Sequence, residues 1–266
     1  MQTRESLAHD LRRLGLGTGD VVMVHASLRR VGEVAGGPDQ VHLAIRDVIT
    51  DEGTMLMYAS CPRYVDEVGR GNLTPEEERQ ILEKLPPFDA HTARSARDNG
   101  DLVELFRTWP GTLVNDHPAR FAVWGKQANH LISEQPWDFA FGEGSLLERF
   151  TTLGGRILLL GSDHDAVTYL HYAEHIAPFP DKRIAKFRVP LLVDGKRTWR
   201  EMSEVDTSSH GAHQNWPDQF FAQIVDAFLA VSHNESGTVG NATSHLFSAR
   251  ELLEFAVPVM ERIARS

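Results

Sequence analysis

Short apolar runs alternate along this chain with stretches in which apolar residues recur every three or four positions. The runs Val21 to His25, Thr54 to Tyr58 and Ile157 to Leu160 have the length and composition of buried strands. Helical spacing covers residues 3–14, 38–49, 102–106, 216–231 and 248–263. Strands interspersed with helices are typical of an α/β protein. We therefore expect a single domain over residues 1–266, built on a mixed sheet flanked by helices.

Two segments depart from this pattern. Val189 to Val193 and Arg197 to Met202 flank Asp194-Gly195, the residues favoured in the two-residue turn of a β-hairpin. Residues 60–100 are polar and rich in proline, glycine and charge, and they are long for a loop. Insertions of this kind usually either cover a site or lack order. We expect this one to lie near a binding site.

The composition limits the class of protein. Of the 266 residues, 41% are hydrophobic, which is enough for a folded core. The formal net charge of −10 disfavours nucleic acid as a partner and suits either a cationic substrate or a well-solvated surface. The single cysteine, Cys61, excludes a disulfide within the chain. With no pattern of a signal peptide or a membrane span, we expect a cytoplasmic protein without a membrane partner, and an oligomer is possible.

The most informative stretch is residues 157–175, where a strand ends at Gly161 and acidic and imidazole side chains follow at once. Polar groups just beyond a strand end commonly form the site of an α/β protein. If the chain continues as one helix, a set of polar side chains shares a face within about 60°: His164, Thr168, His171 and His175. Such a stripe, with Glu174 at its edge, predicts the lining of a cavity.

Within this stripe, His171 is the candidate for chemistry. A neutral imidazole near pH 7 can take a proton from an amine or hydroxyl as that group attacks. Glu174 and the acidic pair Glu204 and Asp206, which follow the hairpin, are possible groups to orient it. The simpler interpretation is a helix histidine that only hydrogen-bonds a neighbour.

The same residues also fit a metal site. His171-Tyr-Ala-Glu174-His175 matches the H-x-x-E-H string of the inverzincin metallopeptidases. Two histidines four residues apart on a helix can bind Zn²⁺, with the glutamate as base. A third ligand is needed, and the sequence does not decide between candidates such as Glu235 and Glu251. A zinc peptidase is therefore an alternative function.

Several blocks resemble the aminoglycoside 3-N-acetyltransferases. The block His25-Ala-Ser27-Leu28-Arg29-Arg30-Val31-Gly32 resembles the H-S-S-(L/F)-R-S-(V/L)-G opening of that family. The block Gly161-x-x-His164-x-x-x-Thr168-x-x-His171-x-x-Glu174 resembles its signature G-x-x-H-x-x-x-T-x-x-H-x-x-E. Shorter similar blocks follow the family's order: Phe88-Asp89 with Thr92, His117-Pro118 and Val239-Gly240-x-Ala242.

The resemblance implies direct transfer of acetyl from acetyl-coenzyme A to the 3-amino group of an aminoglycoside, with no metal, and hence antibiotic resistance. It gives His171 the role of general base, one of the two acidic residues Glu204 and Asp206 that of its orienting group, and Thr168 that of oxyanion support. Glu204 is grouped with the catalytic residues. It implies substrate contacts for Asp66, Glu67, His164, Glu174 and Asp206. It implies coenzyme contacts for His25, Ser27, Leu28, Arg29, Arg30, Val31, Gly32 and His117.

The chain also departs from the family pattern. Val114-Asn115-Asp116 precede His117 where family members commonly read R-S-x, so we expect different coenzyme contacts in that loop. In this family the stretch that corresponds to residues 60–90 shapes the choice of acceptor. A catalytically silent relative that only binds coenzyme A or a cationic small molecule is the remaining alternative.

Overall fold

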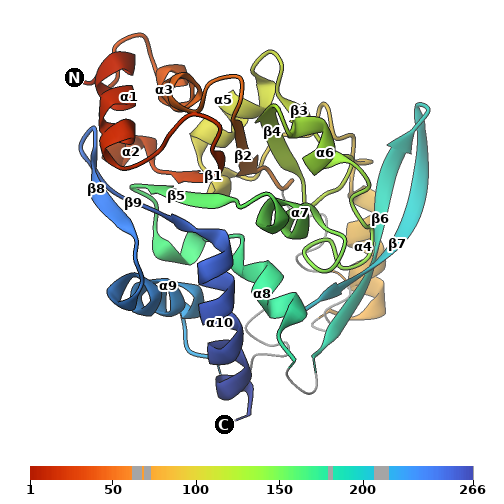
Figure 1. The fold of residues 1–266 in the computed structure, drawn as a ribbon. Helices are drawn as coiled ribbons and strands as arrows, with labels where there is room; N and C mark the ends of the chain where they lie inside the picture. The colour runs from red at the N-terminus through yellow and green to blue at the C-terminus, as the bar shows by residue number, and fades with distance from the viewer. Residues whose placement is uncertain (62–67, 69–72, 179–181, 207–215, 266) are drawn as a thin grey trace.

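A seven-stranded sheet with the strand order β3-β4-β2-β1-β5-β9-β8 forms the centre of the molecule. The structure is a computed structural model, and it describes residues 1–61, 68, 73–178, 182–206 and 216–265 (Figure 1). The strands are β1 (Val21–Ala26), β2 (Thr54–Tyr58), β3 (Leu113–Val114), β4 (Phe121–Gly125), β5 (Arg156–Leu160), β8 (Glu235–Val239) and β9 (Ala242–Ser248). β1 is parallel to β2 and to β5, whereas the remaining pairs are antiparallel. The predicted mixed sheet is therefore confirmed.

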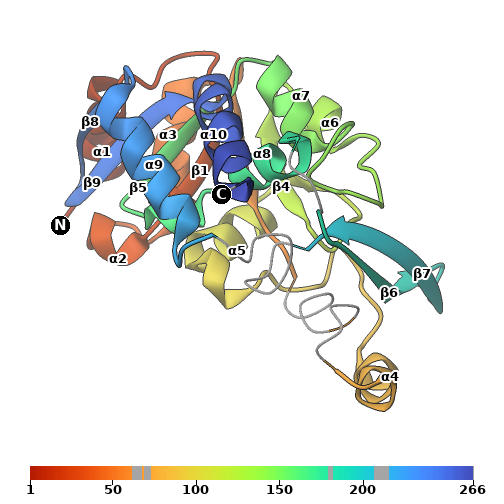
Figure 2. The same ribbon diagram turned by 90° about the horizontal axis from the view of Figure 1, so that it is seen from below.

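Helices cover both faces of this sheet (Figures 1 and 2). On one face lie α1 (Arg4–Arg13), α3 (Asp39–Ile49) and α5 (Asp101–Thr108). On the other lie α6 (Ala128–Ile132), α7 (Leu146–Thr152), α8 (Leu170–Ile176), α9 (Phe220–Val231) and α10 (Ala249–Ala264). Successive side chains of a strand point to opposite faces, so Val22 and Val24 pack in the first core and Met23 in the second. No helix among the described residues is both long and apolar enough to cross a membrane.

Local sequence signals set several element ends. The Thr3 hydroxyl accepts a hydrogen bond from the Ser6 amide at 3.1 Å, and α1 begins there. The last helix, α10, begins in the same way, since the Ser248 hydroxyl accepts from the Glu251 amide at 3.3 Å. The predicted hairpin is also confirmed, as β6 (Ile184–Val193) and β7 (Lys196–Val205) join through residues 194 and 195 with φ of 50° and 73°.

The hairpin β6–β7 is a separate two-stranded sheet that projects from the main body (Figure 1). Its outer part is held by Phe88, whose amide donates to the Pro190 carbonyl at 2.7 Å and whose carbonyl accepts from the Leu192 amide at 2.8 Å. A small apolar cluster fills the space beneath, with Phe187 and Met202 among its members. The base of the hairpin is thereby fixed beside the carboxyl ends of the main strands.

Some sequence expectations were incomplete. The polar segment 60–100 contains the helix α4 (Pro75–Lys84) and the 3₁₀ turn η1 (Arg97–Asn99). Thr74 and Glu77 form a capping box that starts α4, a signal the apolar pattern does not carry because no α4 residue is buried. The short helix α2 (Leu28–Val31) and the strands β3, β8 and β9 were also not predicted. Helix α9 begins at Phe220 rather than at Trp216.

The prediction that residues 164–175 form one continuous helix with a polar stripe is wrong. The chain forms the 3₁₀ turn η2 (His164–Ala166), breaks at Val167, and starts α8 only at Leu170. Val167 is fully buried with φ −71° and ψ 84°, which is not helical. The polar residues expected to share one helix face therefore do not share one.

Candidate functional site

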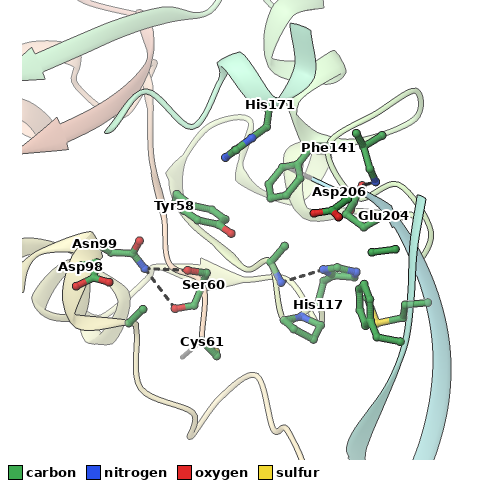
Figure 3. Close-up of a pocket in the computed structure, with 17 residues that line it drawn as sticks. Tyr58, Ser60, Cys61, Asp98, Asn99, His117, Phe141, His171, Glu204 and Asp206 are labelled. Atoms are coloured by element: carbon green, nitrogen blue, oxygen red, sulfur yellow. Dashed lines mark hydrogen bonds between the residues drawn. The ribbon is translucent and has the colours of Figure 1, made fainter. Parts of the chain in front are cut away.

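Two cavities open beyond the carboxyl ends of β1, β2 and β5, where an α/β sheet commonly carries its site. The first, which we call the His171 cavity, has a volume of about 260 Å³ and is shown in Figure 3. Its polar lining residues are Tyr58, Ser60, Cys61, Asp98, Asn99, His117, His171, Glu204 and Asp206. The second, the His25 cavity, has a volume of about 410 Å³.

His171 reaches its cavity from α8 and is held by Glu174. Its Nδ1 donates to Oε2 of Glu174 at 2.5 Å, and the Glu174 side chain is only 3% exposed. Because Nδ1 is engaged, Nε2 is the ring nitrogen left to act as a base when the ring is neutral. The imidazole lies between two phenyl rings, 5.1 Å from Phe141 and 5.0 Å from Phe221 between centroids.

Charges around His171 favour its protonated form. Burial acts to lower the pKa of His171, but the nearby carboxylates outweigh it and hold this pKa above its ordinary value. Those carboxylates are Glu174, which contributes most, then Glu204 and Asp165. A histidine beside these carboxylates can take up a proton during a reaction, and their charge stabilises the imidazolium that results.

Glu204 contacts His175 and not His171. Oε2 of Glu204 accepts from the Ala140 amide at 2.8 Å, while Oε1 accepts from the Val205 amide at 3.0 Å and contacts Nε2 of His175. Glu174 is therefore the carboxylate that hydrogen-bonds the candidate base, and Glu204, one of the two hairpin carboxylates expected to orient it, contacts His175 instead. In sequence, both acidic groups were equally plausible partners, because the hairpin's approach to α8 is a tertiary contact.

The far wall of the His171 cavity carries Asp206 and His117. The Asp206 side chain is 1% exposed, and its Oδ2 lies 3.4 Å from Nε of Arg183. His117 accepts from the Ala119 amide at Nδ1 over 3.0 Å, and burial lowers the pKa of His117 to about 4. A neutral imidazole on this wall leaves the carboxylates of the cavity, Asp98, Glu204 and Asp206, as the groups suited to cationic ligands. His117 lines this cavity, whereas the sequence placed it with the coenzyme residues.

The His25 cavity collects much of the loop after β1. Its lining includes His25, Ser27, Leu28, Arg29 and Thr168. Burial lowers the pKa of His25 to about 4, so this ring is neutral, and its buried Nε2 has no hydrogen-bond partner among the described residues. Buried polar atoms are normally bonded, so this nitrogen marks a position for a polar group of a ligand. Arg29 adds an exposed guanidinium suited to a phosphate.

The two cavities meet at a shared wall made of Tyr58, Asp98 and Asn99. Asn99 fixes this wall, since its Nδ2 donates to Ser60 Oγ at 3.1 Å and to Ser95 Oγ at 3.0 Å. Figure 3 shows His171 and Asn99 on opposite sides of the Tyr58 ring. Ligands bound in the two cavities would therefore contact the same three residues, and His171 lines the first of the two cavities.

Several predicted residues lie elsewhere. The His164 ring contacts Asp226 of α9 at 2.6 Å, and His164 lines a shallow groove outside both cavities. Arg30 donates to the Gly161 carbonyl at 2.7 Å and pairs with Asp163 at 2.6 Å, so its guanidinium ties two loops together. Asp66 and Glu67 lie outside the described residues.

Val31 and Gly32, the last two residues of the 27–32 loop, are needed for the fold. Val31 is fully buried in the apolar core. Gly32 has a φ of 94°, and a Cβ there would lie 2.5 Å from Nδ2 of Asn241. The amides of residues 30, 31 and 32 donate to carbonyls within the same turn. The predicted coenzyme contacts of these two residues therefore find no support in the geometry.

Sequence reasoning missed the shared wall and the aromatic neighbours of the base: Tyr58, Asp98, Asn99, Phe141 and Phe221. Tyr58 could have been found, because it ends a predicted strand of the parallel part of the sheet. The other four lie in turns or at a helix start far from any motif.

The H-x-x-E-H string does not form a metal site in this arrangement. His171 and His175 each contact a carboxylate, and the second ring nitrogen of His175 faces the His171 carbonyl at 2.6 Å. Within the described part of the chain, no group of three or more His, Cys, Asp or Glu side chains could hold a metal ion. These contacts engage both nitrogens of His175, so this side chain has no lone pair to offer Zn²⁺.

An α/β sheet with two neighbouring cavities at its strand ends, one of them lined by a histidine that is hydrogen-bonded to a buried carboxylate, is typical of an enzyme that brings two substrates together. The profile of the aminoglycoside 3-N-acetyltransferase family matches residues 23–261. This chain belongs to that family. The predicted family and enzyme class are confirmed, and the match decides against the zinc peptidase alternative.

Relatives and solved structures agree with this membership. Aminoglycoside N(3)-acetyltransferase VII of Streptomyces paromomycinus is 38% identical over 97% of this chain and 91% of its own. Aminoglycoside N(3)-acetyltransferase III of Pseudomonas aeruginosa is 34% identical over 97% of this chain and 93% of its own. The structure of AAC-IIIb with coenzyme A is 40% identical, covers 98% of this chain and 96% of that one, and has a TM-score of 0.89. That of AAC-VIa bound to sisomicin is 33% identical, covers 98% and 97%, and has a TM-score of 0.90.

Proposed function

We propose that this protein transfers the acetyl group of acetyl-coenzyme A to the 3-amino group of an aminoglycoside, with His171 as general base. The observation that carries this proposal is the meeting of the two cavities at Tyr58, Asp98 and Asn99. The relative solved with coenzyme A and the relative solved with sisomicin support one ligand of each kind. Since acetyl-coenzyme A is a cytoplasmic metabolite, we place the reaction in the cytoplasm.

We assign the coenzyme to the His25 cavity and the antibiotic to the His171 cavity. The buried His25 Nε2 suits a hydrogen-bonding group of the pantetheine chain, and Arg29 suits a phosphate. Glu204 and Asp206 give the other cavity the negative charge that ammonium groups of an aminoglycoside require. The net charge of −10 acts in the same direction over a longer range.

The transfer needs one base and no covalent enzyme intermediate. Nε2 of His171 takes a proton from the 3-amino nitrogen as that nitrogen attacks the thioester carbonyl carbon. A C–N bond forms, and the negative charge that develops on the carbonyl oxygen is stabilised by the Thr168 hydroxyl. The intermediate then collapses, the C–S bond breaks, and the coenzyme A thiolate receives the proton that His171 holds. Glu174 stabilises the imidazolium between these two steps.

A thiol-release assay tests the proposal. The purified protein is mixed with acetyl-coenzyme A and a panel of 2-deoxystreptamine aminoglycosides, and free coenzyme A is measured together with the mass and the position of the acetylated product. We expect release that depends on the antibiotic and a product acetylated at the 3-amino group. Binding of both ligands without release would instead identify the silent relative.

A further inference from the structure

His175 lies one helical turn beyond His171, and both of its ring nitrogens face oxygen atoms. Nδ1 lies 2.6 Å from the carbonyl oxygen of His171, and Nε2 contacts Oε1 of Glu204 on β7. The side chain is 3% exposed. His175 is thus a buried bridge between the helix that carries the base and the hairpin wall of the His171 cavity.

The oxygen atoms determine where the protons of this ring are. A carbonyl oxygen can only accept a hydrogen bond, so Nδ1 must carry a hydrogen. Glu204 accepts from the Ala140 and Val205 amides at 2.8 Å and 3.0 Å, and such donors stabilise a carboxylate in its charged form. An ionised carboxylate is also only an acceptor, so Nε2 must carry a hydrogen too. Hydrogens on both ring nitrogens would make His175 an imidazolium paired with Glu204.

The surroundings are shaped for this ring. A Cβ on Gly142 would lie 3.3 Å from Cδ2 of His175, so only a residue without a side chain leaves the ring its full space here. The Phe141 ring stands edge-on with its centroid 5.9 Å from that of His175. Lys182 Nζ donates to the His175 carbonyl at 2.5 Å and fixes the end of α8.

The same ion pair stands beside the base. The charge of Glu204 raises the pKa of His171, together with the larger effect of Glu174 and that of Asp165 on η2. A cation at His175 offsets the Glu204 charge, which would otherwise act on His171 alone. Lys182, which the Glu174 charge also reaches, is a further cation near this end of α8.

We propose that His175 is a positioning residue of the acetyl transfer. As an imidazolium it ties Glu204 to the backbone of His171 and balances the Glu204 charge beside the base. This role rests on the function proposed above, although the protonation of His175 can be tested without any activity.

The protonation is tested by nitrogen-15 NMR of histidine-labelled protein at pH 7, with His175→Gln to assign the signals. We expect two ring N–H groups with imidazolium nitrogen shifts for His175. A single protonated ring nitrogen overturns the proposal, whether or not the protein acetylates an aminoglycoside. An absence of acetyl transfer by the wild-type protein, in contrast, concerns only the proposed function.

The role is tested with His175→Phe, which keeps an aromatic ring, somewhat larger than the imidazole, and loses both hydrogen bonds and the charge. The charge of Glu204 then favours protonated His171, and a base works only when neutral. We expect the acid limb of the pH profile of kcat/KM to move up by about one pH unit. We also expect kcat at pH 7 to fall about tenfold, since part of the base is then protonated and Glu204 is no longer tied. KM for acetyl-coenzyme A stays within twofold, because His175 does not line the His25 cavity.

Two further variants keep the result interpretable. His175→Gln retains one N–H donor without charge, so its acid limb moves as in His175→Phe while its kcat stays closer to wild type. His233→Phe, at an exposed histidine, leaves the profile unchanged. A lower kcat with an unshifted acid limb in His175→Phe, or an unchanged kcat and profile, overturns the proposal.

Discussion

Nδ1 of His171 lies 2.5 Å from Oε2 of Glu174, three residues later on the same helix. This contact, and not one from the hairpin, orients the candidate base and fixes which ring nitrogen faces the cavity. Glu174 is buried behind His171, so it is placed to act on the ring rather than on a substrate. The substrate contact implied for Glu174 by the family resemblance is therefore replaced by contact with the base.

Glu174→Gln should separate geometry from charge at this contact. The amide retains an oxygen that can accept from Nδ1, but the charge that raises the pKa of His171 is gone. We expect the acid limb of the kcat/KM profile to move to lower pH. We expect kcat to fall about 10²-fold because the imidazolium is less stabilised during transfer. Glu254→Gln on the exposed face of α10 is the control, and an unshifted acid limb in Glu174→Gln would contradict the assignment.

His171→Gln should remove the base with little effect on folding. The side chain lies at a cavity wall and is 27% exposed, so its loss leaves the core intact. We expect acetyl transfer to fall about 10²- to 10⁴-fold, the usual contribution of a positioned base. Turnover is compared with that of His130→Gln, at an exposed histidine of α6, and with the Tm of each variant. A His171→Gln protein that retains more than about a tenth of wild-type turnover has its base elsewhere.

Asp206→Asn should weaken antibiotic binding selectively. Asp206 lines the His171 cavity with a side chain that is 1% exposed, where a charge-assisted hydrogen bond to an ammonium group is strong. Loss of one partner of such a buried pair costs about 2 kcal/mol or more, which corresponds to a KM for the aminoglycoside at least about 30-fold higher. KM for acetyl-coenzyme A should stay the same. The control is Asp101→Asn, because Asp101 lines the His25 cavity and not the His171 cavity. This variant should leave the antibiotic KM within twofold.

Asn99→Ala should affect both substrates at once. Asn99 belongs to the wall shared by the two cavities and holds Ser60 and Ser95 through its amide nitrogen. Without these hydrogen bonds the turn at residues 95–100 is less firmly held. The loss of each bond costs about 1 kcal/mol of stability. We expect KM to rise several-fold for the antibiotic and for acetyl-coenzyme A. Asn129→Ala on α6 is the matched control, and a change confined to one substrate would show that the wall is not shared.

Three buried histidines should make the protein sensitive to mild acid. Burial lowers the pKa of His25, His42 and His117 from 6.5 to about 4. Between these values the unfolded chain binds protons that the folded protein does not, so stability falls as the pH decreases from about 6.5 towards 4. Each group contributes a slope of up to about 1.4 kcal/mol per pH unit.

His42 offers the cleanest test of this slope, because it lies on α3 between Phe106 and Trp109, away from both cavities. The free energy of unfolding should decrease less steeply between pH 6.5 and 5 in His42→Phe than in the wild type. The difference in slope should be the contribution of one histidine, whatever the effect of the substitution on absolute stability. Chemical denaturation at several pH values measures this slope. An unchanged slope would mean that His42 binds its proton equally in both states.

Local patterns in the sequence were enough for the strands of the parallel core and for the family, and they singled out His171 as the candidate base. Apolar runs of strand length predicted β1, β2 and β5, because a strand buried on both faces is a continuous apolar run in the sequence. The Asp194-Gly195 turn gave the hairpin, because its positive φ values restrict the residue types. The block from Gly161 to Glu174 gave the family and pointed to His171.

Only the tertiary structure decided how these residues meet. Four polar residues at helical spacing suggested one stripe, but the backbone at Val167 is not helical. His164 therefore contacts Asp226, whereas His171 lines the cavity. The pairing of Glu204 with His175 depends on where a hairpin some thirty residues away packs, and that packing results from apolar contacts with Phe88 and its neighbours. Hydrophobic periodicity reports which side of an element is buried, whereas the partner of a polar side chain is set by long-range packing that no local pattern contains.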